Sequence, residues 1–148
     1  VHAENNGVFD ESCALLWEDV AAPGTGLERQ LSDDLAIWDP HHNSSASFSA
    51  GPTILGWDMR AGNSSGAITH RIGSAHDMRV RDMDYNPNRP HCIVSGGDDC
   101  NIKFWDLRKH LKPVKIMSCH SHWVWRTRYN PFHDQLILSS STDSSVAL

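Results

Sequence analysis

Short apolar segments separated by turn-forming residues dominate the pattern of the chain, and they are clearest in its second half. Ile102 and Phe104 alternate with Lys103, which is typical of a strand with one buried face. Residues 86–88 and 97–100 carry proline, glycine, asparagine and aspartate, which interrupt a strand ladder or favour tight turns. The pattern therefore predicts strands at 79–85, 92–96 and 101–105, with a fourth, outer strand near 114–117.

The same arrangement of apolar segments and turns continues on both sides of this region. Downstream it predicts strands at 123–129, 135–139 and 145–148. Upstream, where the alternation is weaker, it predicts strands at 14–17, 31–38, 46–50 and 53–57, with loops at 21–26 and 61–66. Since every predicted element is a strand, the sequence indicates an all-β fold.

Four residue types recur at one fixed offset, which indicates an internal repeat. The offset is 44 residues for each of the pairs His76/His120, Tyr85/Tyr129, Ser95/Ser139 and Asp99/Asp143. The first copy ends at Trp105-Asp106. A period of about 40 to 45 residues with a terminal Trp-Asp is typical of WD40 repeats, each of which supplies a four-stranded blade of a β-propeller. The chain therefore resembles a WD40 β-propeller.

Tryptophans at the end of a predicted third strand mark the repeat boundaries. They are Trp17, Trp57 and Trp105, with separations of 40 and 48 residues, whereas Trp38 belongs to an aromatic-x-Pro turn. They delimit the end of a preceding blade at 1–17, a degraded blade at 18–57, an intact blade at 58–105 and a truncated blade at 106–148. A closed propeller needs about 4 to 8 blades. We therefore expect a fragment of about three and a half blades, whose unpaired strand edges should keep it from folding cleanly alone.

The resemblance to WD40 repeats implies a hydrogen-bonded structural tetrad in the intact blade, formed by His76, Ser95, Asp99 and Trp105. A buried indole N–H needs an acceptor, which the Ser95 hydroxyl can supply, and leaving such a group unpaired costs about 1 to 3 kcal/mol. The truncated blade retains His120, Ser139 and Asp143. The degraded blade has Arg29 and Gly51 in place of His and Asp, so it should be held more by its neighbours than by itself.

A Ser-His-Asp hydrolase triad is the enzymatic alternative for the same residue types. Such a triad needs an exposed nucleophile within reach of its base and an oxyanion hole beside it. Ser95 lies in the middle of a predicted strand, and the repeat explains all three residue types together. We therefore favour a structural role and expect no catalytic residue.

The composition argues against several classes of function. The formal net charge is −5 and the 13 Lys and Arg residues are scattered, unlike a nucleic-acid-binding surface. No apolar run reaches the roughly 18 residues of a membrane span, and no signal-peptide pattern opens the chain. Zinc-module spacing is absent among the cysteines, Cys13, Cys92, Cys100 and Cys119, and among the histidines, which include His41, His42, His91, His120 and His122. We expect reduced thiols, no metal and no cofactor.

In the WD40 architecture, partners usually bind the face where the first strand of each blade begins. Carried over to this sequence, that rule selects Arg79, Arg81 and Asp98 in one blade and Trp123, Trp125 and Thr142 in the next. Residues i and i+2 share a face of a strand, so Trp123 and Trp125 should point together. Val124 occupies the core position of Val80, so both tryptophans should be exposed. Trp and Arg dominate interface hot spots, which indicates a partner-binding face.

Longer segments carry a closer resemblance to one family. The runs GDDCNIKFWDLRKHLKPVK and HSHWVWRTRYN, followed by HDQLILSSSTDSSV, are similar to the EARP and GARP complex-interacting protein family of WD-repeat proteins. The similarity extends from Gly56 to Val146 and includes WDPHHN at 38–43, but it is loose over residues 1–30. Gly51 and Pro52 replace the turn residues that the family would have.

That resemblance implies a non-enzymatic scaffold whose partners are subunits of a multisubunit vesicle-tethering complex. It also implies a cytoplasmic protein, peripheral to the trans-Golgi network and endosomes and not inserted in the membrane. Its role would be in endosomal recycling and endosome-to-Golgi retrograde transport. Because the fold hosts many functions, three alternatives stay open: a peroxisomal targeting-peptide receptor, a ubiquitin-ligase substrate adaptor and, more remotely, a hydrolase.

Overall fold

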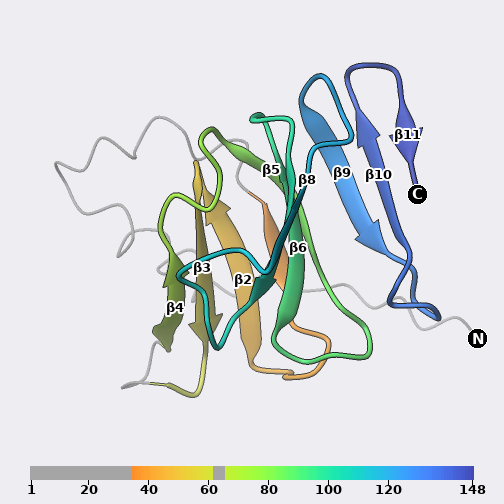
Figure 1. The fold of residues 1–148 in the computed structure, drawn as a ribbon. Coiled ribbons are helices and arrows are strands. Elements are labelled where there is room, and N and C mark those ends of the chain that lie inside the picture. Colours follow the sequence, from red (N-terminus) through yellow and green to blue (C-terminus); the bar gives the residue numbers. More distant parts are fainter. Residues whose placement is uncertain (1–34, 62–65) are drawn as a thin grey trace, which may run out of the picture. The chain divides into compact units, whose positions relative to one another are not determined.

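A computed structural model describes residues 35–61 and 66–148 of the chain (Figure 1). Within these residues every regular element is a strand and every pairing is antiparallel, which confirms the predicted all-β class. The strands form three sheets, in the orders β1-β2-β3-β4, β5-β6-β7-β8 and β11-β10-β9. This part of the chain contains no helix with the length and apolar character needed to cross a bilayer. The strand predicted at 14–17 and the loop at 21–26 lie outside the described residues.

The first sheet consists of β1 (Ala36–Trp38), β2 (Ser45–Ala50), β3 (Thr53–Asp58) and β4 (Ala67–Ile72). Strand β4 is absent from the sequence prediction. It pairs only with β3, at the edge of the sheet, and Ile68 and Thr69 are exposed, so it lacks the apolar alternation of a buried strand. Since β4 follows Trp57 and belongs to the same sheet, this sheet crosses the repeat boundary drawn at that tryptophan.

The second sheet consists of β5 (Val80–Tyr85), β6 (Cys92–Gly97), β7 (Ile102–Asp106) and the outer strand β8 (Lys115–Met117). All four overlap the predicted strands. The prediction of a half-buried strand at 101–105 is wrong, because Lys103 is only 8% exposed. Its Nζ donates to the carbonyl of Ala75 at 2.9 Å and lies 3.1 Å from the Asp99 carboxylate. This lysine is buried because both faces of the sheet are covered.

The third sheet consists of β9 (Val124–Tyr129), β10 (Ile137–Ser141) and β11 (Val146–Ala147). All three overlap the strands predicted downstream. Strand β9 lies at one edge of the ladder, pairs only with β10, and contacts β5 and β6 of the second sheet. Strand β9 therefore lies against the second sheet.

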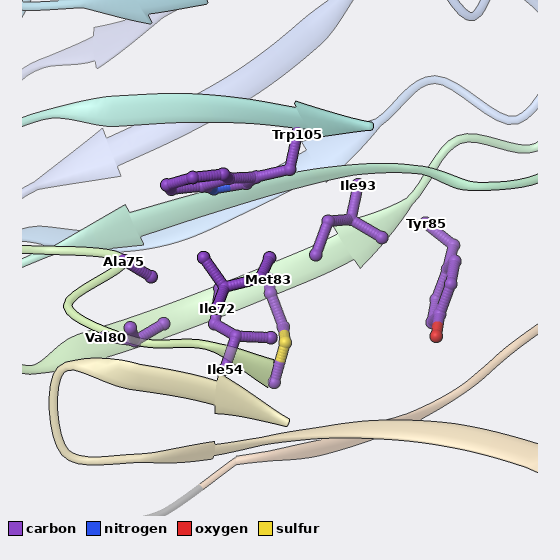
Figure 2. Close-up of a cluster of buried hydrophobic side chains, with 8 residues drawn as sticks. All are labelled: Ile54, Ile72, Ala75, Val80, Met83, Tyr85, Ile93 and Trp105. Carbon is purple, nitrogen blue, oxygen red and sulfur yellow. The ribbon is translucent and has the colours of Figure 1, made fainter. Parts of the chain in front are cut away.

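Two hydrophobic clusters hold the sheets together. The larger joins the first and second sheets (Figure 2) and contains Ile54, Ile72, Ala75, Val80, Met83, Tyr85, Ile93 and Trp105. The smaller contains Val94, Ile102 and Val124 and joins the second sheet to the third. Full burial of side chains such as Ile54 and Met83, both 0% exposed, stabilises by about 1.5 to 3 kcal/mol each. Consecutive β6 residues, Ile93 and Val94, point into different clusters, so the second sheet is the centre of the packing.

Candidate interaction surface

Two β-bulges set the direction of the side chains at the start of β5 and β9. The register of β5 on β6 shifts at Arg81, and the register of β9 on β10 shifts at Trp125. A bulge adds one residue to a strand and re-aims its side chains. Val80 and Met83, three residues apart, consequently point into the same cluster. Strict alternation therefore fails at the point where the interaction surface was predicted.

The Arg81 guanidinium lies against one carboxylate and two indole rings. Its Nε and Nη2 donate to the two carboxylate oxygens of Asp98 at 2.6 and 3.0 Å. Its Cζ lies 5.2 Å from the ring centroid of Trp123 and 4.9 Å from that of Trp125. The bidentate ion pair with Asp98 fixes the plane of the Arg81 guanidinium, and cation–π attraction holds both indoles against it. One arginine of β5 thus orders two aromatic side chains at the start of the third sheet.

Both indoles remain accessible to solvent although they contact Arg81. Trp123 is 37% exposed and Trp125 is 45% exposed, whereas Val124 between them has no exposed surface. The exposure predicted from the match of Val124 with Val80 is therefore confirmed. Neighbouring aromatic side chains that are ordered yet exposed are typical of contact surfaces.

The other predicted residues border the same cluster. The N–H of Asp98 donates to the carbonyl of Arg79 at 2.9 Å, and the N–H of Thr142 donates to the carbonyl of Trp123 at 3.1 Å. The His122 ring hydrogen-bonds the Thr142 hydroxyl and lies 5.0 Å from the Trp123 ring. The six residues selected from the sequence therefore form one connected group. His122 is a further member that the positional rule omits.

The repeat residues of the second sheet form a chain of hydrogen bonds. Trp105 Nε1 donates to Ser95 Oγ at 2.9 Å, which lies 2.7 Å from His76 Nε2, and His76 Nδ1 lies 2.8 Å from Asp99 Oδ1. Burial alone would raise the pKa of Asp99, but the hydrogen bond and charge of His76, with Lys103, hold that pKa well below its usual range. Ser95 and His76 are 0% exposed, so this Ser-His-Asp set offers no accessible nucleophile to a substrate.

The third sheet has a similar network with one additional member. His120 Nε2 lies 2.8 Å from Ser139 Oγ, while His120 Nδ1 lies 2.9 Å from Ser145 Oγ and 3.3 Å from Asp143. Hydrogen bonds from the Ser145 hydroxyl and from a backbone N–H lower the pKa of Asp143. Comparison of the two repeats does not reveal Ser145, because the matching position in the first copy is Asn101.

The first sheet differs at the serine position of the network. Ser95 pairs with Lys103, two residues before Trp105. In the first sheet, the residue that pairs two positions before Trp57 is Phe48, which has no side-chain hydroxyl. Trp57 Nε1 is consequently buried without a hydrogen-bond partner in the described part of the chain.

Hydrogen bonds to the second sheet take the place of that internal network. The Ser47 hydroxyl lies 2.6 Å from the Tyr85 hydroxyl of β5, whose pKa burial raises to about 12. The carbonyl of Gly51 accepts from the N–H of Val80 at 2.9 Å, and the following carbonyl accepts from the N–H of His76 at 3.2 Å. Gly51 has φ 58°, a left-handed conformation that favours glycine in this turn. The predicted Arg29 lies outside the described residues.

Two carboxylates of β5, which the sequence prediction omits, accept hydrogen bonds from backbone N–H groups at the free edge of β9. Asp82 Oδ2 accepts from the N–H of Thr127 at 2.8 Å, and Asp84 Oδ2 accepts from the N–H of Tyr129 at 2.9 Å. Arg128 Nη1 lies 2.5 Å from Asp82, which has no exposed surface. Burial raises the pKa of Asp84. The Asp-x-Asp spacing in a strand is the sequence signal for this pair, because i and i+2 share a face.

The histidines near β1 have structural contacts. His41 Nε2 lies 2.8 Å from the carbonyl of Asn86, and His42 Nδ1 lies 2.8 Å from Asp39. His91 stacks obliquely on His42, with ring centroids 5.9 Å apart. Across residues 35–61 and 66–148, no three His, Cys, Asp or Glu side chains are grouped so that they could hold a metal ion.

Comparison with known proteins gives one family and several named relatives. A family model described as the EIPR1 beta-propeller matches residues 28–148. The chain is 46% identical over 138 residues to EARP and GARP complex-interacting protein 1 of Rattus norvegicus, covering 93% of the chain and 34% of that protein. It is 38% identical over 114 residues to EARP-interacting protein 1 of Caenorhabditis elegans, covering 76% of the chain and 30% of that protein.

A plant relative carries a more general name. The chain is 37% identical over 149 residues to WD repeat-containing protein DWA2 of Arabidopsis thaliana, with 95% of the chain and 40% of that protein covered. The chain therefore spans between 30% and 40% of the length of these three curated relatives.

Proposed function

Because this chain belongs to the EIPR1 beta-propeller family, we propose that its protein is a non-enzymatic scaffold that binds the EARP and GARP tethering complexes. Two relatives are named for interaction with these complexes. The observation that carries the proposal is the exposed indole pair at the start of β9, held in place by Arg81. The Ser-His-Asp residues of the repeats, in contrast, are engaged in internal hydrogen bonds.

The contact face in this proposal consists of Arg79, Arg81, Asp98, Trp123, Trp125 and Thr142. It is supported by the connected geometry of these residues and by the preference of hot spots for Trp and Arg. The proposed setting is cytoplasmic, peripheral to the trans-Golgi network and endosomes, in endosomal recycling and endosome-to-Golgi retrograde transport. The complex-interacting names of the relatives support this setting.

The test is capture of purified EARP and GARP complexes by the full-length protein and by a Trp123→Ser/Trp125→Ser variant. Loss of hot-spot tryptophans costs about 2 kcal/mol or more each, so affinity should fall more than tenfold. Phe132→Ser is the matched control, because Phe132 is 82% exposed but follows the other end of β9. Its capture should equal that of the wild type.

The two parts of the proposal fail in different ways. Wild-type protein that captures neither complex would contradict the function. Normal capture by a folded double-tryptophan variant, with an unchanged melting temperature, would contradict the assigned face alone.

A further inference from the structure

Resting on the proposed function, we infer that the indole pair receives an acidic segment of the partner, whose carboxylates pair with Arg126 beside Trp125. The inference comes from the sign of the charge that solvent can reach. The chain as a whole is acidic, with a formal net charge of −5. Next to Trp125 along β9, however, the exposed charged side chain is the cation of Arg126.

The carboxylates around the indoles are covered or already paired. The side chain of Asp82 is 0% exposed, that of Asp98 is 8% exposed and that of Asp99 is 5% exposed. Arg81 occupies both carboxylate oxygens of Asp98. The side chain of Arg126, in contrast, is 63% exposed. An approaching segment therefore meets the cation of Arg126 at this position, while the carboxylates of Asp82, Asp98 and Asp99 are covered by the protein.

Arg126 and the indoles are close enough to meet one segment together. Arg126 Nη1 lies 3.6 Å from Asp82 Oδ1, and the ring of Trp125 lies 4.9 Å from the guanidinium carbon of Arg81. Two consecutive residues of β9 thus contact two consecutive residues of β5. The indole of Trp125 and the guanidinium of Arg126 therefore come from adjacent positions of β9, next to adjacent positions of β5.

The unused hydrogen-bonding groups of the two indoles are donors. Neither Trp123 nor Trp125 uses its indole N–H in a hydrogen bond within residues 35–61 and 66–148, and an indole nitrogen can only donate. The distance of 3.6 Å leaves Arg126 with a loose ion pair, so its guanidinium retains donors for a carboxylate. A partner must therefore supply acceptors, and carboxylates supply them together with complementary charge.

The experiment measures association rates of the full-length protein with the purified EARP and GARP complexes at low and high salt. Removing a charge at the border of an interface acts mainly on the association rate, so Arg126→Gln should slow it about threefold at low salt. The difference should shrink as salt screens the charges. Arg126→Lys keeps the charge and should restore most of the rate.

Two further variants test whether the association rate depends on the sign of the charge and on its place in the sheet. Asp77 is exposed in the loop before β5, so Asp77→Asn removes a charge that repels an acidic segment and should raise the rate. Arg108→Gln is the matched control, because the Arg108 side chain is 66% exposed and paired with Asp106, but it follows the end of β7. Since β5 and β7 run parallel, Arg108 lies at the other end of the sheet and its loss should leave the rate unchanged.

The outcomes separate this inference from the proposed function. Unchanged or faster association of Arg126→Gln, or slower association of Asp77→Asn, would overturn the acidic partner even if loss of the tryptophans abolishes capture. Absence of capture by the wild type would overturn the proposed function itself. Equal melting temperatures of the variants assign the rate changes to binding.

Discussion

Trp57 and Trp105 lie one residue before the end of the third strands of two adjacent sheets, yet their indole nitrogens have opposite environments. Trp105 Nε1 donates to the Ser95 hydroxyl, and the chain of hydrogen bonds continues from Ser95 through His76 to the ionised carboxylate of Asp99. Trp57 Nε1 is buried with no partner among the described residues, because Phe48 stands at the serine position. The repeat therefore keeps its tryptophan even where the hydrogen bonds that accompany it are lost.

The difference shows two ways in which such a sheet is stabilised. The second sheet carries its own polar network and is packed on both faces. The first sheet uses hydrogen bonds to the second, through Ser47 and the carbonyl of Gly51. Its apolar residue Ile54 belongs to the same shared core (Figure 2). Stability of the first sheet should therefore depend on the second more than the reverse.

Among the substitutions that test this difference between the two sheets, Ser95→Ala in the full-length protein should lower the free energy of unfolding most. The substitution leaves the Trp105 N–H and His76 Nε2 buried without partners. Each unpaired group costs about 1 to 3 kcal/mol, so the free energy of unfolding should fall by about 2 to 6 kcal/mol. Denaturant unfolding measures this, with Ser140→Ala in β10 as the control. A loss no greater than that of the control would show that the network contributes little.

Acid should weaken the second sheet through Asp99. The folded-state pKa of Asp99 lies well below the unfolded value of about 3.9, so its stabilising contribution is complete above that value and is lost as pH falls further. Asp99→Asn should therefore lower stability at neutral pH, and its difference from the wild type should narrow below about pH 4. Thermal melts across this range give the comparison.

Asp106→Asn is the control for that measurement. Arg108 lowers the pKa of Asp106 to about 2, but this pair lies at the surface, where ion pairs contribute little. A pH dependence of the same size for both variants would contradict a special role for the buried network.

A smaller loss of stability should follow from Ser47→Ala, which tests the hydrogen bond between the first and second sheets. The Tyr85 hydroxyl would stay buried without its partner, at a cost of about 1 to 3 kcal/mol. The double variant with Tyr85→Phe removes both groups and should recover part of that loss, because no polar group is then left unpaired. Additive losses in the double-mutant cycle would show that the two hydroxyls do not stabilise each other.

Regular spacing made most of the second and third sheets predictable from the sequence, whereas contacts between sheets were not. The strands around Ser95 follow from period-two patterns, turns and a fixed repeat. Burial of Lys103 depends on a neighbouring sheet that packs on its face, which local alternation cannot indicate. The sequence predicts that Arg81, Trp123 and Trp125 belong to one partner-binding face, but it does not predict their cation–π contacts. The β-bulges at Arg81 and Trp125, which set the direction of these side chains, leave no local sequence signal.

The smallest effect should come from Trp57→Phe. Phenylalanine retains most of the apolar ring and removes an N–H that has no partner among the described residues. Removing this unpaired donor stabilises the protein and so offsets part of the stability that is lost with the smaller ring. We expect a change within about 1 kcal/mol in denaturant unfolding of the full-length protein. Trp105→Phe is the matched contrast and should cost clearly more, because it removes the donor to Ser95. Equal losses at the two positions would mean that the Trp57 N–H has an acceptor in the full-length protein, and the distinction between the two sheets would then rest on Ser47 and Gly51 alone.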